Sequence, residues 1–156
     1  MLAPGDLAPD FTLPTDTGAS LTLSALRGRP VVLYFYPKDD PETCTKEACD
    51  FRDLIPRFDT SGVTVLGVSP DTVKSHAKFK RKYALPFTLL ADTEHRVAEA
   101  YDVWHEKSMF GHTYMGVLRT TFVIDAAGRV ARVFEKVRTA GHAAEVAAAV
   151  TELAGR

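Results

Sequence analysis

Apolar residues form two short uninterrupted runs in the first half of the chain. Residues 30–37 read PVVLYFYP, and residues 63–69 read VTVLGVS. Runs of this length that are rich in β-branched and aromatic residues are typical of strands covered on both faces. We therefore expect both runs to be buried strands.

Periodic patterns in the other segments predict four helices and five further strands. We expect helices at residues 44–56, 71–83, 93–101 and 142–153, and strands at 11–13, 20–23, 86–90, 119–125 and 129–136. Asp71 is the expected N-cap of the second helix. Ala126–Ala127–Gly128 is expected to join the last two strands as a hairpin.

The order of these elements is β-α-β-α-β-α-β-β-α after the two short N-terminal strands. It predicts an α/β protein with a mixed central sheet flanked by helices and an N-terminal β extension. This order agrees with a thioredoxin-like fold. Because no linker divides the chain, we expect residues 1–156 to form a single domain.

The composition is that of an ordinary globular protein, with 46% apolar and 25% charged residues and a net charge of −1. The even mixture of acids and bases does not indicate a nucleic-acid partner. No apolar run is long enough to span a membrane, and the N-terminus does not resemble a secretory signal. We therefore expect a cytoplasmic location.

Cys44 and Cys49 are the only two cysteines of the chain. Cys44 stands where the first apolar strand runs into a helix, so its thiol should meet unpaired backbone N–H groups and the positive end of the helix dipole. Both features favour the thiolate, and a nearby arginine would lower the thiol pKa further from its usual value of about 8.5. The placement favours redox catalysis at Cys44 over the alternative of a buried, inert thiol.

The spacing of the two cysteines constrains how they could react with each other. Five residues along an α-helix correspond to a rotation of ~500° and a rise of ~7.5 Å, so the two Cα atoms would lie roughly 8–9 Å apart. A disulfide requires less than ~7 Å. If Cys49 captures an oxidised Cys44, the first turns of the helix must therefore unwind. Cys49 would also pack as a small apolar residue in the reduced state.

Four segments resemble one known family. The segment VVLYFYPKDDPETCTKEACDFRD resembles the active-site region of peroxiredoxins of the bacterioferritin-comigratory or PrxQ subgroup, as do KSMFGHTYMGVLRTTFVIDAAGRV, GDLAPDFTLPTDTG and GHAAEV. The resemblance implies a thioredoxin-like fold and a thiol peroxidase that reduces hydrogen peroxide and organic hydroperoxides. It also implies a monomer that needs no cofactor or metal and is recycled by thioredoxin or a similar dithiol protein.

The resemblance assigns a role to five residues. Cys44 matches the peroxidatic cysteine, and Cys49 matches the resolving cysteine that forms an intrachain disulfide with it. Pro37 matches the proline that shields the thiolate. Arg119 matches the arginine that stabilises the thiolate and polarises the peroxide, and Glu47 matches the glutamate that orients this arginine.

One position departs from the family pattern. Pro41 stands three residues before Cys44, where the family usually has a threonine or serine hydroxyl, and proline offers neither a side-chain donor nor a backbone N–H. The nearby hydroxyls belong to Thr43 and Thr45. We expect Thr43 to replace the missing group in part.

Other interpretations of the sequence remain open. A disulfide oxidoreductase would have two residues between its cysteines at the start of the helix, a spacing that this chain lacks. A redox sensor or holdase switched by cysteine oxidation would use the same two thiols without turnover. Trp104, Met109 and Phe110, in an expected loop, either form an apolar wall near Cys44 or pack elsewhere.

Overall fold

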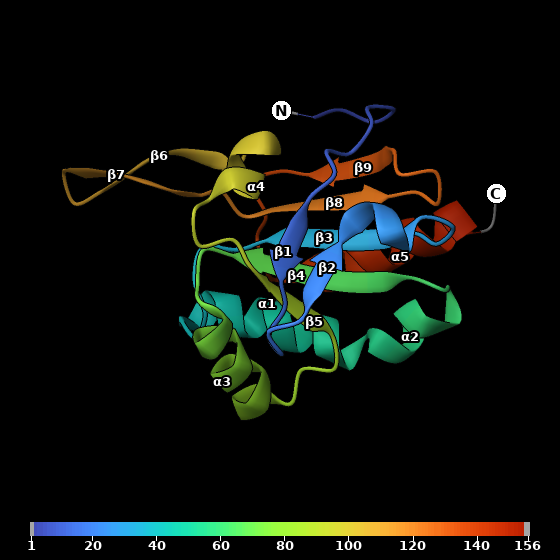
Figure 1. Cartoon of the computed structure of the whole chain (residues 1–156), viewed down its shortest axis with the longest axis horizontal. Coiled ribbons are helices and arrows are strands. Elements are labelled where there is room, and N and C mark those ends of the chain that lie inside the picture. The colour runs from blue at the N-terminus through green and yellow to red at the C-terminus, as the bar shows by residue number, and fades with distance from the viewer. Residues whose placement is uncertain (1, 155–156) are drawn as a thin grey trace.

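A computed structural model describes residues 2–154, and its centre is a five-stranded sheet (Figure 1). The strands lie in the order β5-β4-β3-β8-β9. Their bounds are β3 Val31–Phe35, β4 Thr64–Ser69, β5 Thr88–Ala91, β8 Thr120–Ile124 and β9 Val130–Phe134.

The sheet is mixed, as the element order predicts. β3 runs parallel to β4, and β4 runs parallel to β5, whereas β8 is antiparallel to both β3 and β9. Every residue of β3 is buried, which confirms the interpretation of its apolar run as a central strand. In β4, all residues after Thr64 are buried. A strand covered on both faces has no need of alternating polar residues.

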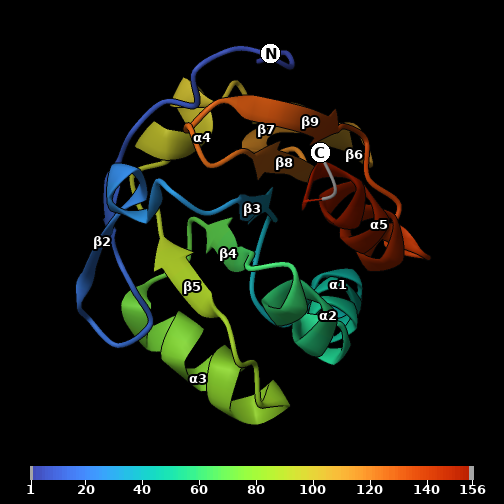
Figure 2. The ribbon, with the colours of Figure 1, turned by 90° about the vertical axis from the view of Figure 1, so that its right-hand side faces the viewer.

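Helices cover both faces of this sheet (Figure 2). Their bounds are α1 Glu42–Asp53, α2 Ile55–Thr60, α3 Val73–Tyr83, α4 Arg96–Ala100 and α5 His142–Ala154. Side chains of α1, α2, α3 and α5 share one apolar cluster, whereas α4 packs into a second cluster on the other face. This arrangement is the thioredoxin-like α/β fold.

The expected N-terminal β extension is confirmed. β1 (Thr12–Pro14) and β2 (Ser20–Thr22) pair antiparallel, and a 3-10 helix, η1 (Leu23–Leu26), follows. Leu13 and Leu23 bury their side chains in the second apolar cluster, so the extension covers the face that carries α4.

Several helix boundaries differ from the prediction. The helix expected from Cys44 to about Pro56 begins at Glu42 and ends at Asp53, and α2 follows as a separate helix. Pro56 explains the break, because proline has no N–H for an interior helical bond but fits the first turn of a new helix. The expected N-cap Asp71 was also wrong, because Thr72 caps α3 by accepting a hydrogen bond from the Ser75 amide.

The segment expected to be a loop around Trp104–Phe110 is a β-hairpin. β6 (Trp104–Met109) pairs antiparallel with β7 (His112–Val117), and the hairpin extends away from the body of the protein (Figure 1). Its turn places Phe110 and Gly111 at φ of 52° and 79°. Two-residue turns of this kind usually carry Asn-Gly or Asp-Gly. Because phenylalanine stands at the first turn position here, the sequence lacks the pattern that would predict a hairpin.

No helix in residues 2–154 is both long enough and apolar enough to cross a membrane.

Candidate active site

Cys44 lies in the first turn of α1, at the end of the loop that follows β3. The helix begins at Glu42, so Cys44 is its third residue and only 3% of its surface is exposed. The amides of a first helical turn have no partner within the helix. Pro41 stands at the N-cap and makes no side-chain hydrogen bond to them. Their N–H groups therefore contribute positive potential beside the sulfur.

Arg119 joins Cys44 to Glu47. It immediately precedes β8, and the pairing of Phe35 with Thr120 places it beside the end of β3. Its Nη2 donates to the Cys44 Sγ at 3.0 Å, and its Nη1 donates to Glu47 Oε1. One rigid guanidinium thus contacts both the thiol and a carboxylate one helical turn further along α1.

Burial and neighbouring charges shift the pKa values of Glu47 and Arg119 in opposite directions. Burial raises the pKa of Glu47 to about 7, although Arg119 acts to lower it. Glu47 Oε2 is buried with no hydrogen-bond partner among the residues that the structure describes. Burial disfavours the charge of Arg119, but Glu47 and Cys44 outweigh it and raise the pKa of the guanidinium. The arginine therefore stays cationic beside the sulfur.

Lys107 is a second cation that interacts electrostatically with Arg119 and Cys44. It was not predicted as a site residue, because its segment was expected to be a loop. The half-buried ammonium donates to the Val117 carbonyl oxygen at 2.8 Å. Its pKa is lowered by burial and then by Arg119, while the charge of Cys44 acts in the opposite direction. Gly116 gives the lysine stem room to cross the hairpin, since a Cβ there would lie 2.9 Å from Lys107 Cδ.

The other predicted site residues make no hydrogen bond to Cys44 or Arg119 among the residues that the structure describes. Cys49 lies half-buried on the same helix as Cys44, and both thiols are free. Pro37 is half-buried in the loop before α1, and Thr43 is exposed in the first turn of α1. The hydroxyl of Thr45 donates to the Asp40 carbonyl oxygen at 3.1 Å, so it is engaged away from the thiol.

Trp104, Met109 and Phe110 do not pack with Cys44 in one apolar cluster. Trp104 stacks on His95 with ring centroids 4.1 Å apart, and it packs on the second apolar cluster. Cys44 belongs to the first cluster. Phe110 and Met109 are 95% and 56% exposed. The packing alternative is therefore the correct one for Trp104.

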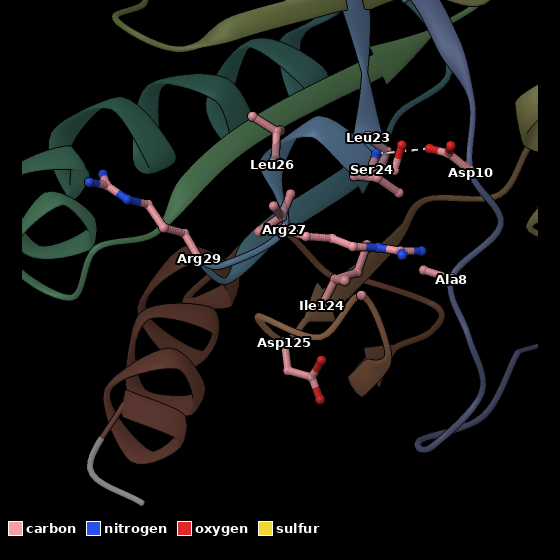
Figure 3. A pocket seen from close by; sticks show the side chains of 11 residues that line it. Ala8, Asp10, Leu23, Ser24, Leu26, Arg27, Arg29, Ile124 and Asp125 are labelled. Carbon is pink, nitrogen blue, oxygen red and sulfur yellow. Dashed lines mark hydrogen bonds between the residues drawn. The ribbon is translucent and has the colours of Figure 1, made fainter.

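A separate hollow lies at the opposite end of β3 (Figure 3). Its lining includes Val31, which begins β3, and Ile124, which ends β8. Its volume of about 10 Å³ leaves room for roughly one water molecule. It is too small and too far along the strand to serve Cys44.

Two buried groups should make stability depend on pH in opposite directions. Glu47 has a pKa of about 7 in the folded protein, against an ordinary value of 4.5. The folded state therefore keeps this proton to a higher pH than the unfolded chain does, and the free energy of unfolding falls as pH rises from 4.5 to 7. Burial and then Arg119 lower the pKa of His142 from 6.5 to about 4, so stability falls as pH drops from 6.5 to 4. Each effect amounts to about 3 kcal/mol at most.

Urea unfolding of the reduced protein between pH 4 and 8.5 measures this dependence. Because the two effects oppose each other over nearly the same pH range, they largely cancel in the unmodified protein. Glu47→Gln should leave a stability that falls as pH drops from 6.5 to 4, and His142→Gln should leave one that falls as pH rises from 4.5 to 7. Each variant serves as the control for the other. Parallel profiles for all three proteins would contradict this assignment.

A buried cysteine in the first helical turn after a central strand of a thioredoxin-like fold, with an arginine donating to its sulfur, defines a thiol peroxidase of the peroxiredoxin class. Residues 4–133 match the model of the AhpC/TSA family. The chain therefore belongs to the AhpC/TSA family, and its relatives place it in the Bcp/PrxQ group of peroxiredoxins.

Both sequences and structures support this membership. The chain is 54% identical to the putative peroxiredoxin Bcp of Coxiella burnetii over 91% of this chain and 94% of that protein. It is 50% identical to the peroxiredoxin Bcp of Bacillus subtilis over 90% of each. The bacterioferritin comigratory protein of Xanthomonas campestris, described by its alkyl peroxide reduction activity, superimposes with a TM-score of 0.92 at 39% identity, over 97% of this chain and 99% of that one.

Proposed function

We propose that Cys44 is the peroxidatic residue of this thiol peroxidase and that Arg119 assists it. The thiolate sulfur attacks one peroxide oxygen, an S–O bond forms and the O–O bond breaks. The sulfur loses two electrons and becomes a sulfenic acid, while the other oxygen leaves with a proton as water or an alcohol. The 3.0 Å contact between Arg119 Nη2 and the Cys44 Sγ is the observation that carries this proposal.

The supporting residues act through Arg119 and the loop. Glu47 accepts from Arg119 Nη1 and so orients the guanidinium. Pro37, in the loop between β3 and α1, shields the thiolate from water. As charge develops on the leaving oxygen, the arginine and the first amides of α1 stabilise it.

Cys49 completes the cycle as the resolving residue. Its sulfur attacks the sulfenic sulfur of Cys44, an S–S bond forms, the S–O bond breaks, and the hydroxyl leaves as water with the proton of the Cys49 thiol. Both cysteines belong to the same intact helix, which holds their Cα atoms roughly 8–9 Å apart. The first turns of α1 must therefore unwind before the disulfide can form.

The reductant and substrates follow from the same chemistry. A dithiol protein of the thioredoxin type reduces the disulfide by thiol exchange and is itself oxidised. Alkyl hydroperoxides are proposed as substrates beside hydrogen peroxide, in line with the activity described for the Xanthomonas campestris relative. A monomeric, cytoplasmic enzyme remains our expectation from the sequence.

Cys49→Ser tests the resolving role. The variant is expected to consume one equivalent of peroxide and then to accumulate sulfenic acid, because the second sulfur is missing. Intact mass spectrometry after substoichiometric peroxide, together with steady-state turnover with thioredoxin, measures both steps. The unmodified protein should lose two thiols per peroxide and turn over repeatedly, whereas a sensor or holdase would react once and stop. Full turnover of Cys49→Ser would show that another group resolves Cys44.

Thr43→Val tests whether this hydroxyl replaces the one missing at Pro41. The variant is expected to slow peroxide reduction by about tenfold, the value of one well-placed hydrogen bond. Thr45→Val is the matched control, because its hydroxyl is bonded to Asp40. Stopped-flow rates with hydrogen peroxide measure both variants, and equal rates for Thr43→Val and the unmodified protein would discard the hypothesis.

A further inference from the structure

Asp39, five residues before Cys44, is buried although it is an acid. Its carboxylate accepts hydrogen bonds from Tyr36 Oη at 2.6 Å and from Ser75 Oγ at 2.8 Å, and His76 Nδ1 lies 2.8 Å from Oδ2. Its backbone amide donates to Asp71 Oδ2 at 2.8 Å. The loop that leads to the active-site helix is therefore held at one point by the first turn of α3.

The contact between Asp39 and His76 contains one shared proton. His76 Nε2 lies 2.9 Å from the Leu90 carbonyl oxygen, which can only accept, so Nε2 carries a hydrogen. A second proton must lie between Nδ1 and the carboxylate, because two lone pairs at 2.8 Å would repel. His76 is fully buried, so water cannot substitute for either partner. The pair is a fixed anchor for the loop.

Asp40, the next residue of the loop, is held by the last turn of α3. Its carboxylate accepts from Lys82 Nζ at 3.1 Å and from Tyr83 Oη at 2.9 Å. Its backbone has a φ of 79°, a left-handed conformation that costs free energy in a residue other than glycine. Its carbonyl oxygen accepts from Thr45 Oγ1 at 3.1 Å. A strained residue thus connects α3 to the first turn of α1.

The other end of α1 is also fastened to α3. Arg52 Nη1 donates to the Tyr83 carbonyl oxygen at 2.8 Å. The loop before α1 and the last turn of α1 therefore both contact one rigid helix. The cysteines lie between these two attachment points.

We propose that Ser75, His76, Lys82 and Tyr83 of α3 are positioning residues that hold Asp39 and Asp40 and thereby oppose the unwinding of α1. This inference rests on the proposed function, in which α1 unwinds so that Cys49 can reach Cys44. We call the four residues the α3 clamp. A firm clamp keeps Cys44 beside Arg119 for reaction with peroxide and delays disulfide formation. The delay leaves the sulfenic acid open to a second peroxide, which converts it to sulfinic acid.

The experiment substitutes Ser75, Lys82 and Tyr83 of the α3 clamp and leaves His76 in place, because a substitution of buried His76 could unfold the protein. In Ser75→Ala and in the double variant Lys82→Met/Tyr83→Phe, disulfide formation is expected to be about fivefold faster, the effect of losing one exposed charge pair or hydrogen bond. The fraction of sulfinic acid at high peroxide should fall by a similar factor. The rate of the first reaction with peroxide should stay within about twofold, since folded α1 still predominates.

Lys80→Met is the matched control. Lys80 also belongs to α3, but its ammonium pairs with Asp16 at 3.1 Å and does not contact the active-site loop. Stopped-flow fluorescence or rapid quench with mass spectrometry separates the two steps. A clamp variant with unchanged disulfide formation and unchanged sulfinic acid would overturn the inference. If the unmodified protein forms no Cys44–Cys49 disulfide, the proposed function itself fails.

Discussion

Cys44→Ser is expected to abolish catalytic peroxide reduction, with turnover lowered by a factor of about 10⁴ or more. The reason is chemical, because a serine hydroxyl remains protonated near neutral pH and is a poor nucleophile toward the O–O bond. The substitution exchanges sulfur for oxygen at a buried position and keeps the rest of the first turn of α1. A thioredoxin-coupled assay that follows reductant consumption measures the loss.

The remaining cysteine provides the internal control for this result. Cys49 is the only other thiol of the chain, and in Cys49→Ser the first reaction with peroxide should proceed at an unchanged rate. A single-turnover measurement therefore separates the two cysteines, because only Cys44→Ser should lack the fast phase. Turnover by Cys44→Ser near that of the unmodified protein would contradict the assignment of the nucleophile.

The sequence predicts the parts of the site that depend on local pattern. The run Val31–Phe35 is apolar throughout because both faces of β3 are covered, and this alone places Cys44 near a strand-to-helix junction. The late hairpin of β8 and β9 follows from its turn, where Gly128 has a φ of 85°. Signals within a few residues thus suffice for the sheet and for the position of the nucleophile.

The local sequence pattern does not predict which distant segments contact each other. Lys107 approaches Arg119 through a hairpin whose mostly exposed residues show no apolar face, so its segment was expected to be a loop. The contacts of Asp39 with His76 span 37 residues, and nothing in the local sequence of either residue distinguishes a buried pair from a solvated one. Arg119 was predicted as a site residue only from the family resemblance. The structure shows its contact with Cys44.

Arg119→Met is expected to slow the first reaction of Cys44 with hydroperoxide by about 10²–10³-fold, the effect of removing one donor aimed at developing charge. Methionine keeps much of the length of the side chain but removes both hydrogen bonds, to the Cys44 Sγ and to Glu47 Oε1. Arg119→Lys should give a smaller loss, because it keeps the charge but a single ammonium lacks the rigid fork that contacts both groups. Stopped-flow rates over a range of hydroperoxide concentrations measure each loss.

Arg132→Met is the matched control, since Arg132 lies over the Phe134 ring at 4.7 Å on β9 and belongs to no contact of the site. Repeating the series at about pH 9.5, where an ordinary thiol with a pKa of about 8.5 is ionised, separates two roles of Arg119. A deficit that disappears at high pH would mean that the arginine only promotes ionisation of the sulfur. A deficit that persists would mean that the guanidinium also acts on the peroxide oxygens. We expect it to persist, because Nη2 lies 3.0 Å from the sulfur that the peroxide oxygen must approach.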